Sequence, residues 1–147
     1  MRLRTVKISD RKELAKYLVH YWKSRGMNQF PVSWTLRYLK NGMTFEMKEE
    51  RFVLLGNGNE ILGTIALLMY NENVAEIRDE VWENYRFGSL LLKYLINYAR
   101  KKRFKKIYSL ALKDKIMFYR NHGFVKEGLL RSQFKKGEHV TVMSKFI

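Results

Sequence analysis

The stretch from Arg51 to Trp82 restricts the folds open to this chain more than any other segment. It contains three short apolar runs, rich in Val, Ile and Leu, separated by the turn sequences GNGN and NEN. Asn-Gly tolerates the positive φ of a tight hairpin turn, so the pattern predicts three consecutive antiparallel strands. From Phe87 the spacing becomes helical, with two adjacent apolar rows made by Leu91, Leu95, Tyr98, Leu92, Ile96 and Ala99. A helix with so wide an apolar face is expected to pack on the sheet.

The flanking segments predict further strands and helices. Before the block we expect a strand over residues 3–8, a helix started by an Asp10–Glu13 capping box and ended at Gly26, and a second helix from Ser33 to Gly42. After it we expect a strand over residues 105–112, a short helix ending at Gly123, and two strands paired around residues 136–137. The order is β-α-α-β-β-β-α-β-α-β-β, an α/β fold with a central mixed, mostly antiparallel sheet flanked by helices.

Length and composition limit the class of protein. At 147 residues, with no repeat or linker, the chain is expected to be one domain, residues 1–147. It contains no cysteine, which excludes a disulfide framework and a cysteinyl acyl-enzyme intermediate. The longest apolar run, residues 65–70, is far shorter than the ~20 residues that span a bilayer, and the first residues lack the apolar core of a signal peptide. We therefore expect a cytoplasmic protein that does not contact a membrane.

A net charge of +15 widens the range of partners. A positive field of this size attracts nucleic acid, acidic proteins and polyphosphate cofactors, although solubility alone is an alternative explanation. Six of the seven residues from Arg100 to Lys106 are cationic. Cations stabilise the C-terminal end of a helix, which is one interpretation of this run, and contact with nucleic acid is the other. The three histidines lack the spacing of metal ligands, so no metal site is predicted.

The start of the helix near Phe87 has the composition of an anion site. Arg86 and Gly88 precede the apolar rows in the sequence YRFGSLLL. The first N–H groups of a helix lack internal partners, so those of Gly88, Ser89 and Leu90 would be free to bind a phosphate. Arg86 would add a cation, and the glycine would allow a ligand to approach the main chain closely. Many buried helices also begin after a glycine, so an ordinary helix start is the alternative.

The predicted topology and four sequence segments resemble the GNAT superfamily of acyl-CoA N-acyltransferases. The segments are VAEIRDEVW, YRFGSLLL, FYRNHGF and the terminal GEHVTVMSKFI, and the resemblance covers essentially the whole chain. It implies a single-domain GNAT-like fold and acetyl-CoA as the cofactor. FYRNHGF is similar to the family's FYxxxGF segment, which implies that Tyr119 is the general acid near the cofactor sulfur. A tyrosine that only packs at a helix end is the alternative.

The cofactor loop of the family is only partly present. The family pattern is Arg or Gln, two residues, Gly, one residue, and Gly or Ala. In this chain Glu83 stands at the basic position, Arg86 at the first glycine, and only Gly88 matches. A shifted alignment retains Tyr-Arg and the helix start but shortens the loop. In both alignments the phosphate cradle is reduced and Arg86 would supply charge in place of one amide. The pyrophosphate is expected at the backbone of Arg86–Leu90, which includes Phe87.

Acyl transfer to an amine also needs a base. An amine with a pKa of ~10.4 must lose a proton to attack at neutral pH, which costs about 4–5 kcal/mol. The segment AEI is similar to the family strand that carries a catalytic glutamate, which makes Glu76 the first candidate. Glu80 and Asp79 follow, and strict alternation would place Glu80 on the face of Glu76 and Asp79 on the other. Ion pairs with nearby Lys or Arg are the alternative. The resemblance also implies that the backbone near Val81 and Trp82 binds the pantetheine arm.

Two hypotheses about function follow. The first is an acetyl-CoA-dependent N-acetyltransferase that acetylates a primary amine of a small molecule, peptide or protein by direct attack in a ternary complex. The second is a basic nucleic-acid- or CoA-binding module on the same scaffold with weak or lost catalysis, which the reduced loop and the charge favour. The aromatic residues of the first two helices would either shape the acceptor pocket or form core; they are Tyr17, Tyr21, Trp22, Phe30 and Trp34. The sequence leaves open the acceptor and the choice between monomer and dimer.

Overall fold

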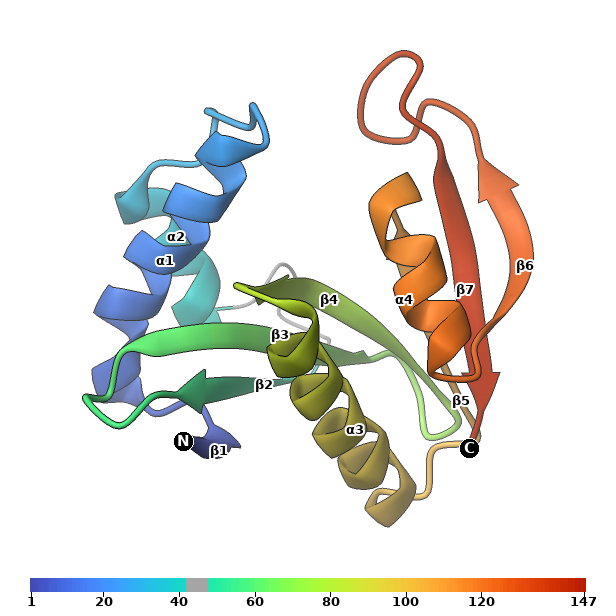
Figure 1. Ribbon diagram of the computed structural model, residues 1–147, viewed down its shortest axis with the longest axis horizontal. Helices are drawn as coiled ribbons and strands as arrows, with labels where there is room; N and C mark the ends of the chain where they lie inside the picture. The colour runs from blue at the N-terminus through green and yellow to red at the C-terminus, as the bar shows by residue number, and fades with distance from the viewer. Residues whose placement is uncertain (42–47) are drawn as a thin grey trace.

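The computed structural model describes residues 1–41 and 48–147. Within them seven strands form one sheet in the order β1-β2-β3-β4-β5-β7-β6 (Figure 1). Neighbouring strands are antiparallel except for β4 and β5, which are parallel. The strands are β1 (Arg2–Thr5), β2 (Lys48–Leu55), β3 (Ile61–Met69), β4 (Val74–Trp82), β5 (Lys106–Ala111), β6 (Val125–Leu130) and β7 (Val140–Phe146).

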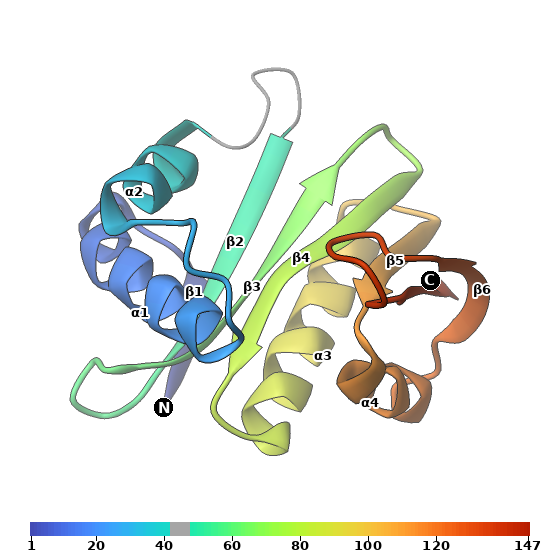
Figure 2. The same ribbon diagram turned by 90° about the horizontal axis from the view of Figure 1, so that it is seen from above.

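Helices cover both faces of the sheet. In the described part of the chain they are α1 (Arg11–Ser24), α2 (Val32–Asn41), α3 (Tyr85–Lys101) and α4 (Ile116–Asn121), with 3-10 turns η1 (Ile8–Asp10) and η2 (Lys113–Lys115). Figure 2 shows α1 and α2 side by side against β2 and β3, with α3 on the opposite side of these strands. The predicted element order is therefore confirmed.

Two apolar clusters hold these layers together. The larger one lies between the sheet and the α3–α4 layer and includes Leu91, Leu95 and Ala99 from the predicted rows of α3. The smaller one lies under α1 and α2 and is built around Leu14, Leu18 and Trp22. Tyr17, Tyr21, Phe30 and Trp34 pack against this second cluster. The aromatic residues of the first two helices thus contribute to core packing.

The turn glycines behave as their sequence positions predict. Gly26, Gly123 and Gly137 have φ of +75°, +79° and +83°, after α1, after α4 and in the β6–β7 turn. Only glycine adopts this conformation without strain from a β carbon. In the β2–β3 hairpin the positive φ of +64° falls on Asn59, two positions after the predicted turn centre begins at Asn57.

Two details at helix starts differ from expectation. Helix α1 does begin next to Asp10, but the Asp10 carboxylate does not cap it. It accepts hydrogen bonds from the Arg4 guanidinium at 2.6 and 2.9 Å and from the Lys7 N–H at 2.6 Å, because the turn η1 folds it back towards β1. Helix α2 begins at Val32, so Ser33 lies in its first turn and not before it. The predicted end of this helix at Gly42 lies outside the described residues.

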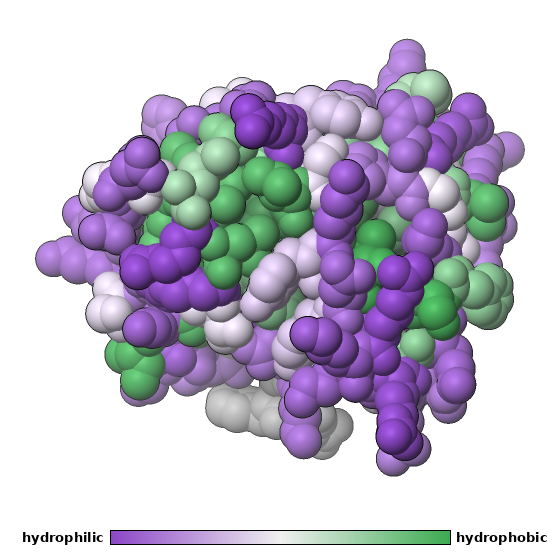
Figure 3. Space-filling model, turned by 60° about the horizontal axis from the view of Figure 1, so that its bottom comes forward, coloured by the Kyte–Doolittle hydropathy of each residue, from purple (hydrophilic) through white to green (hydrophobic). Residues whose placement is uncertain are grey.

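The sheet is not fully covered on the α3 side. Helix α3 packs chiefly against β2, β3 and β4, which leaves the β1 edge less protected. Figure 3, which views the molecule from below, shows an apolar area on its left side, within a rim of hydrophilic side chains. Among the described residues, no helix has the length and apolar character needed to cross a membrane.

Candidate active site

Strands β4 and β5 separate near the middle of the sheet. They pair in parallel only from Val74 with Lys106 to Ile77 with Ser109. Beyond this point β4 continues to Trp82 and β5 to Ala111 without pairing to each other. The main-chain groups on the β5 side of β4 are therefore available to other partners over the last part of the strand.

A β-bulge in β4 marks the point of separation. Asp79 and Glu80 together lie opposite the single residue Ile65 of β3, since Thr64 pairs with Val81 and Ala66 with Arg78. Asp79 has a φ of +46°, which is unfavourable for a residue with a side chain. A bulge inserts one residue into the ladder and so reverses the alternation of side chains beyond it.

The bulge overturns the predicted assignment of carboxylates to faces. Glu76 lies on the α1–α2 side with Tyr108, whereas Glu80 lies on the α3–α4 side with Ser109. Asp79 shares the side of Glu76, because it contacts Tyr38 of α2. The expectation that Glu76 and Glu80 share a face is wrong, and strict alternation fails because β4 has one residue more than β3 at this point.

Distant residues hold the bulge in place. The Arg51 guanidinium of β2 donates to Asp79 Oδ2 at 2.7 Å, and the Tyr38 hydroxyl donates to the same oxygen. Arg51 is 6% exposed and also pairs with Glu49 at 2.8 Å. Burial acts to lower the pKa of Arg51, but the Asp79 and Glu49 carboxylates outweigh it and raise that pKa. The bulge is thus stabilised by a buried ion pair that links β2 to β4.

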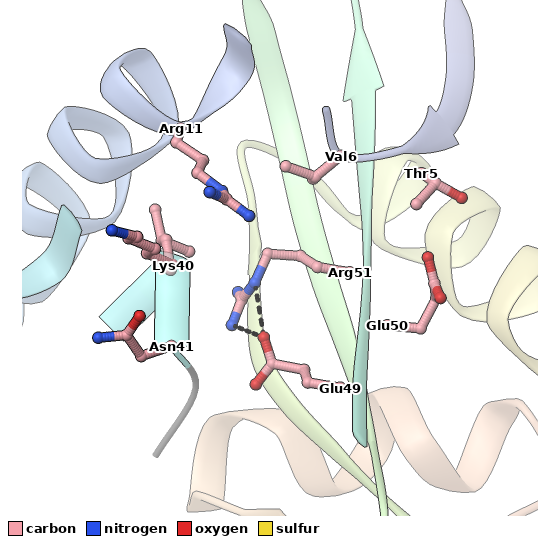
Figure 4. Close-up of a pocket in the computed structure, with 9 residues that line it drawn as sticks. Thr5, Val6, Arg11, Lys40, Asn41, Glu49, Glu50 and Arg51 are labelled. Atoms are coloured by element: carbon pink, nitrogen blue, oxygen red, sulfur yellow. Dashed lines mark hydrogen bonds and ion pairs between the residues drawn. The ribbon is translucent and has the colours of Figure 1, made fainter. Parts of the chain in front are cut away.

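The Arg51 side chain also lines a hollow on the α1–α2 side, shown in Figure 4. The hollow has a volume of about 260 Å³ and lies between the end of α2 and strands β1 and β2. In Figure 4 the Arg11 and Lys40 side chains approach it from the helices, and Glu49 and Arg51, neighbours on β2, are hydrogen-bonded to each other at its strand side. Cations and carboxylates alternate around this space, so it presents no single sign of charge to a ligand.

A buried polar cluster lies where β4 leaves β5, on the α3–α4 side. The Ser109 hydroxyl donates to Glu80 Oε1 at 3.3 Å. The Lys115 ammonium donates to the main-chain oxygen of Glu80 and lies 3.9 Å from Glu80 Oε1. The Tyr119 ring is fully buried, and its hydroxyl has no hydrogen-bond partner among the described residues. The structure therefore brings together two of the predicted catalytic residues, Glu80 and Tyr119.

Burial sets the proton affinities of this cluster. It raises the pKa of Glu80, an effect that the nearby Lys115 cation opposes. It lowers the pKa of Lys115, and the Glu80 carboxylate opposes that shift. It raises the pKa of Tyr119 well above the usual range, and the Glu80 charge adds to this rise. A carboxylate with a raised pKa beside a neutral tyrosine is an arrangement suited to accepting and donating protons.

Glu76 has a different environment. One of its oxygens accepts from Arg78 Nε at 2.9 Å. The other accepts from the Tyr70 hydroxyl and from the Tyr108 hydroxyl at 3.2 Å. Both carboxylate oxygens are thus occupied by donors, and the side chain is 4% exposed. This network fixes the position of the Glu76 carboxylate and holds Tyr70 and Tyr108 beside it.

Beyond Ile77 and Ser109 the strands β4 and β5 leave an opening between them. The direction of the main-chain groups decides which residues of β4 face this opening. The Glu83 N–H donates to Leu62 O of β3, so by alternation the main-chain groups of Val81 also point towards β3. Those of Glu80 and Trp82 point to the β5 side, in agreement with the Lys115 contact to Glu80 O. Of the two residues predicted to bind the pantetheine arm, Trp82 directs its main-chain groups to the opening, whereas Val81 directs them to β3. Glu80 replaces Val81 as a candidate, and binding of the arm remains a prediction.

Helix α3 begins two residues earlier than predicted. Asn84 is its N-cap, and its side chain accepts from the Phe87 N–H at 3.1 Å. The Gly88 N–H donates to Asn84 O, and Ser89 and Leu90 follow in the helix body, where N–H groups bond internally. The expected free amides at Gly88, Ser89 and Leu90 are therefore wrong. The first N–H groups of a helix have no partner within it, and at this end they include those of Tyr85 and Arg86, whose side chains are both exposed.

Gly88 serves side-chain packing. A β carbon at this position would lie 2.6 Å from two ring atoms of Trp82. The Trp82 ring also contacts Phe118, at 4.6 Å between ring centroids, and the Lys115 ammonium, at 4.0 Å from the ring centroid. The glycine thus admits the indole into the space between α3 and α4.

The basic run from Arg100 to Lys106 lies at the other end of α3. Its first part forms the last turn of the helix, where cations interact favourably with the helix dipole. Phe104 is buried, and Lys106 pairs with Glu127 at 2.6 Å. This geometry favours the structural interpretation of the run. Among the residues that the structure describes, no three His, Cys, Asp or Glu side chains gather as a metal site.

Sequence patterns did not single out Lys115 or Ser109. The sequence could have indicated Lys115, because it stands four residues before Tyr119, and residues four apart lie on the same side of a helix. A signal for the bulge existed too, since the adjacent charges Asp79 and Glu80 break the alternation of the strand.

Comparison with known proteins identifies the family. Residues 12–124 match the model of the acetyltransferase (GNAT) family. An aminoglycoside 6'-N-acetyltransferase complexed with coenzyme A has a TM-score of 0.79 at 16% identity, with 99% of this chain and 97% of that chain covered. A GNAT-family acetyltransferase from Streptococcus pneumoniae has a TM-score of 0.79 at 19% identity, with 99% and 98% covered. A dodecameric spermidine N-acetyltransferase from Vibrio cholerae has a TM-score of 0.75 at 22% identity, with 99% and 92% covered.

A search of curated proteins returned no match. At these identities the structural likenesses show the fold, and the family model covers well over half of the chain. The chain therefore belongs to the GNAT family, and it is an acetyltransferase that uses acetyl-CoA.

Proposed function

We propose that this acetyltransferase transfers the acetyl group to a primary amine by direct attack within a ternary complex. The amine nitrogen bonds to the acetyl carbon, the carbon–sulfur bond breaks, and CoA leaves as the thiol. The chain contains no cysteine, so no cysteinyl intermediate is available. The observation that carries the proposal is that Glu80 and Tyr119 lie close together on one face, where β4 and β5 separate.

The cofactor fits the residues around this opening. The main-chain groups of Glu80 and Trp82 face it and are suited to pair with the amide groups of the pantetheine arm. The first N–H groups of α3, those of Tyr85 and Arg86, are suited to the pyrophosphate together with the Arg86 guanidinium. The buried Tyr119 hydroxyl lies beside Glu80 and Ser109, next to the place where β4 and β5 separate. When bound, acetyl-CoA supplies the activated thioester.

Two proton transfers then follow from the cluster. Glu80 accepts the proton lost by the attacking amine, because burial raises the pKa of its carboxyl above the usual value. Tyr119 donates a proton to the departing thiolate and recovers one from Glu80, which it faces. Glu76 is the weaker candidate for the base, because its carboxylate is already paired with Arg78 and two tyrosines.

The proposed acceptor is a primary amine. Among primary amines, the proposal favours molecules with little net positive charge. Structural neighbours are named as aminoglycoside and spermidine acetyltransferases, and both of these acceptors are polycations. A protein with a net charge of +15 repels polycations and attracts anionic molecules. An amine that stands near a carboxylate or phosphate group is therefore favoured over spermidine.

Acetyl transfer from acetyl-CoA to a panel of amines tests the proposal. The panel contains spermidine, an aminoglycoside, and the lysine side chain of an acidic and of a basic peptide of equal length. We expect thiol release with the acidic peptide to exceed that with the basic peptide, and more so at low salt. Binding of CoA is measured first by calorimetry. If CoA does not bind at millimolar concentration, the proposed function is wrong.

A further inference from the structure

The Lys115 ammonium occupies the opening between β4 and β5. Its side chain is 12% exposed, although it begins at the end of the surface turn η2. The ammonium donates to Glu80 O, which is a main-chain group on the open side of β4. It lies 4.0 Å from the centroid of the Trp82 ring and 3.9 Å from Glu80 Oε1.

These contacts compensate for burial of the charge. A lysine ammonium loses its hydration when buried and is stable there only with a hydrogen-bond acceptor, a carboxylate or an aromatic face. Lys115 has one of each: Glu80 O, the Glu80 carboxylate and the Trp82 ring. Its position is therefore specific, in contrast to the exposed Lys113 of the same turn, for which no close contact is found among the described residues.

An ion pair between the segment after α1 and the turn η2 also spans the opening next to Lys115. Arg25, just after α1, pairs with Asp114 of η2 at 2.6 Å. The Tyr21 ring of α1 lies 5.8 Å from the Lys115 ammonium. The turn that carries Lys115 is thus connected to the opposite layer of the molecule by an ion pair whose two side chains are 37% and 48% exposed. Such an exposed pair contributes little stability and opens easily.

We propose that Lys115 takes the place of the cofactor arm on β4, and that acetyl-CoA must displace this side chain in order to bind. The inference rests on the proposed function, in which the arm pairs with the main chain of Glu80 and Trp82. The ammonium and an amide of the arm need the same carbonyl group and the same space beside the indole. Lys115 thereby sets the affinity for the cofactor.

Displacement of Lys115 also changes the proton affinity of the Glu80 carboxylate. While the ammonium is in place, it stabilises the charged form of Glu80 and opposes the rise of its pKa. Once the ammonium has moved away, Glu80 loses this neighbouring cation and keeps the hydrogen bond from the Ser109 hydroxyl. Binding of the cofactor thus makes Glu80 a stronger base at the moment when a base is needed.

Substitution of Lys115 by methionine tests the competition. Lys115→Met retains an unbranched side chain over Trp82 but removes the ammonium, whereas Lys113→Met removes the same charge from an exposed position of the same turn. By calorimetry with CoA, we expect Lys115→Met to bind about tenfold more tightly than wild type, because the cofactor no longer has to break a hydrogen bond from a charged group to Glu80 O. Lys113→Met should bind equally or slightly more weakly, since it loses only attraction for a polyanion. Weaker or unchanged binding by Lys115→Met overturns the inference.

Lysine reactivity provides a second test that needs no variant. In the wild-type protein, reductive methylation followed by peptide mass spectrometry reports the exposure of each amine. We expect Lys115 to be protected in the free protein and to become reactive when CoA is added, while Lys113 reacts equally in both. Increased protection of Lys115 by CoA would contradict displacement.

The two proposals fail in different ways. If wild type binds CoA but Lys115→Met gains nothing, the displacement of Lys115 is wrong and the proposed function stands. If neither wild type nor Lys115→Met binds CoA, both are wrong. If only Lys115→Met binds, CoA does not displace the wild-type Lys115 side chain, and both proposals are wrong.

Discussion

Gly88 provides a direct test of how α3 packs at the opening. The change Gly88→Val places a β carbon 2.6 Å from two Trp82 ring atoms, about 1 Å closer than a favourable carbon–carbon contact. The indole has little room to retreat, because Phe118 and Lys115 lie against it. Overpacking of this kind lowers the free energy of unfolding by ~1–3 kcal/mol. The higher helix propensity of valine offsets only about 0.5 kcal/mol of this loss.

We therefore expect the free energy of unfolding of Gly88→Val to fall by about 2 kcal/mol. For a chain of this length the melting temperature should fall by about 4–8 °C. Denaturant and thermal unfolding, followed by circular dichroism, measure both quantities. Ser89→Val is the matched control, since it introduces the same residue at the next helix position, where the side chain is partly exposed.

A double-mutant cycle identifies the cause of the loss. In a Trp82→Ala background the indole is absent, so Gly88→Val should lose little further stability. We expect a coupling energy above about 1 kcal/mol between the two positions. If Gly88→Val is as stable as Ser89→Val, or if the loss is the same in both backgrounds, the packing argument is refuted.

The remaining predictions concern the site. Tyr119→Phe should lower kcat by ~10²-fold with little effect on the KM for acetyl-CoA. It should leave the melting temperature unchanged or slightly higher, because the hydroxyl has no partner among the described residues. Glu80→Gln should slow turnover by ~10²-fold near neutral pH and less at high pH, where more free amine exists, whereas Glu76→Gln should show no such pH dependence. The activity of wild type should decline as the pH falls through the raised pKa of Glu80. Arg86→Ala should weaken CoA binding measured by calorimetry, and more at low salt than at high salt; equal losses at both would remove its electrostatic role.

Local patterns in the sequence were enough to predict the element order. The apolar runs of residues 51–82, with the Asn-Gly turn and the Asn-Glu-Asn turn between them, specify three paired strands, because strand periodicity and turn conformation depend on adjacent residues. The rows of α3 specified its buried face for the same reason. Tyr119 could be assigned to the site from its motif, and the structure places it in the buried cluster beside Glu80. Whether it acts as the acid remains a prediction.

Only the tertiary structure decided which side chains meet. The bulge at Asp79 depends on Arg51 and Tyr38, which lie 28 and 41 positions away along the chain. It turns Glu80 to the other face, an outcome that alternation within β4 cannot supply. Lys115 likewise has its place because β4 and β5 separate and expose a carbonyl group. Periodicity records which face of an element is buried, whereas contacts between strands and layers determine where the ladder is interrupted and which charges are buried there.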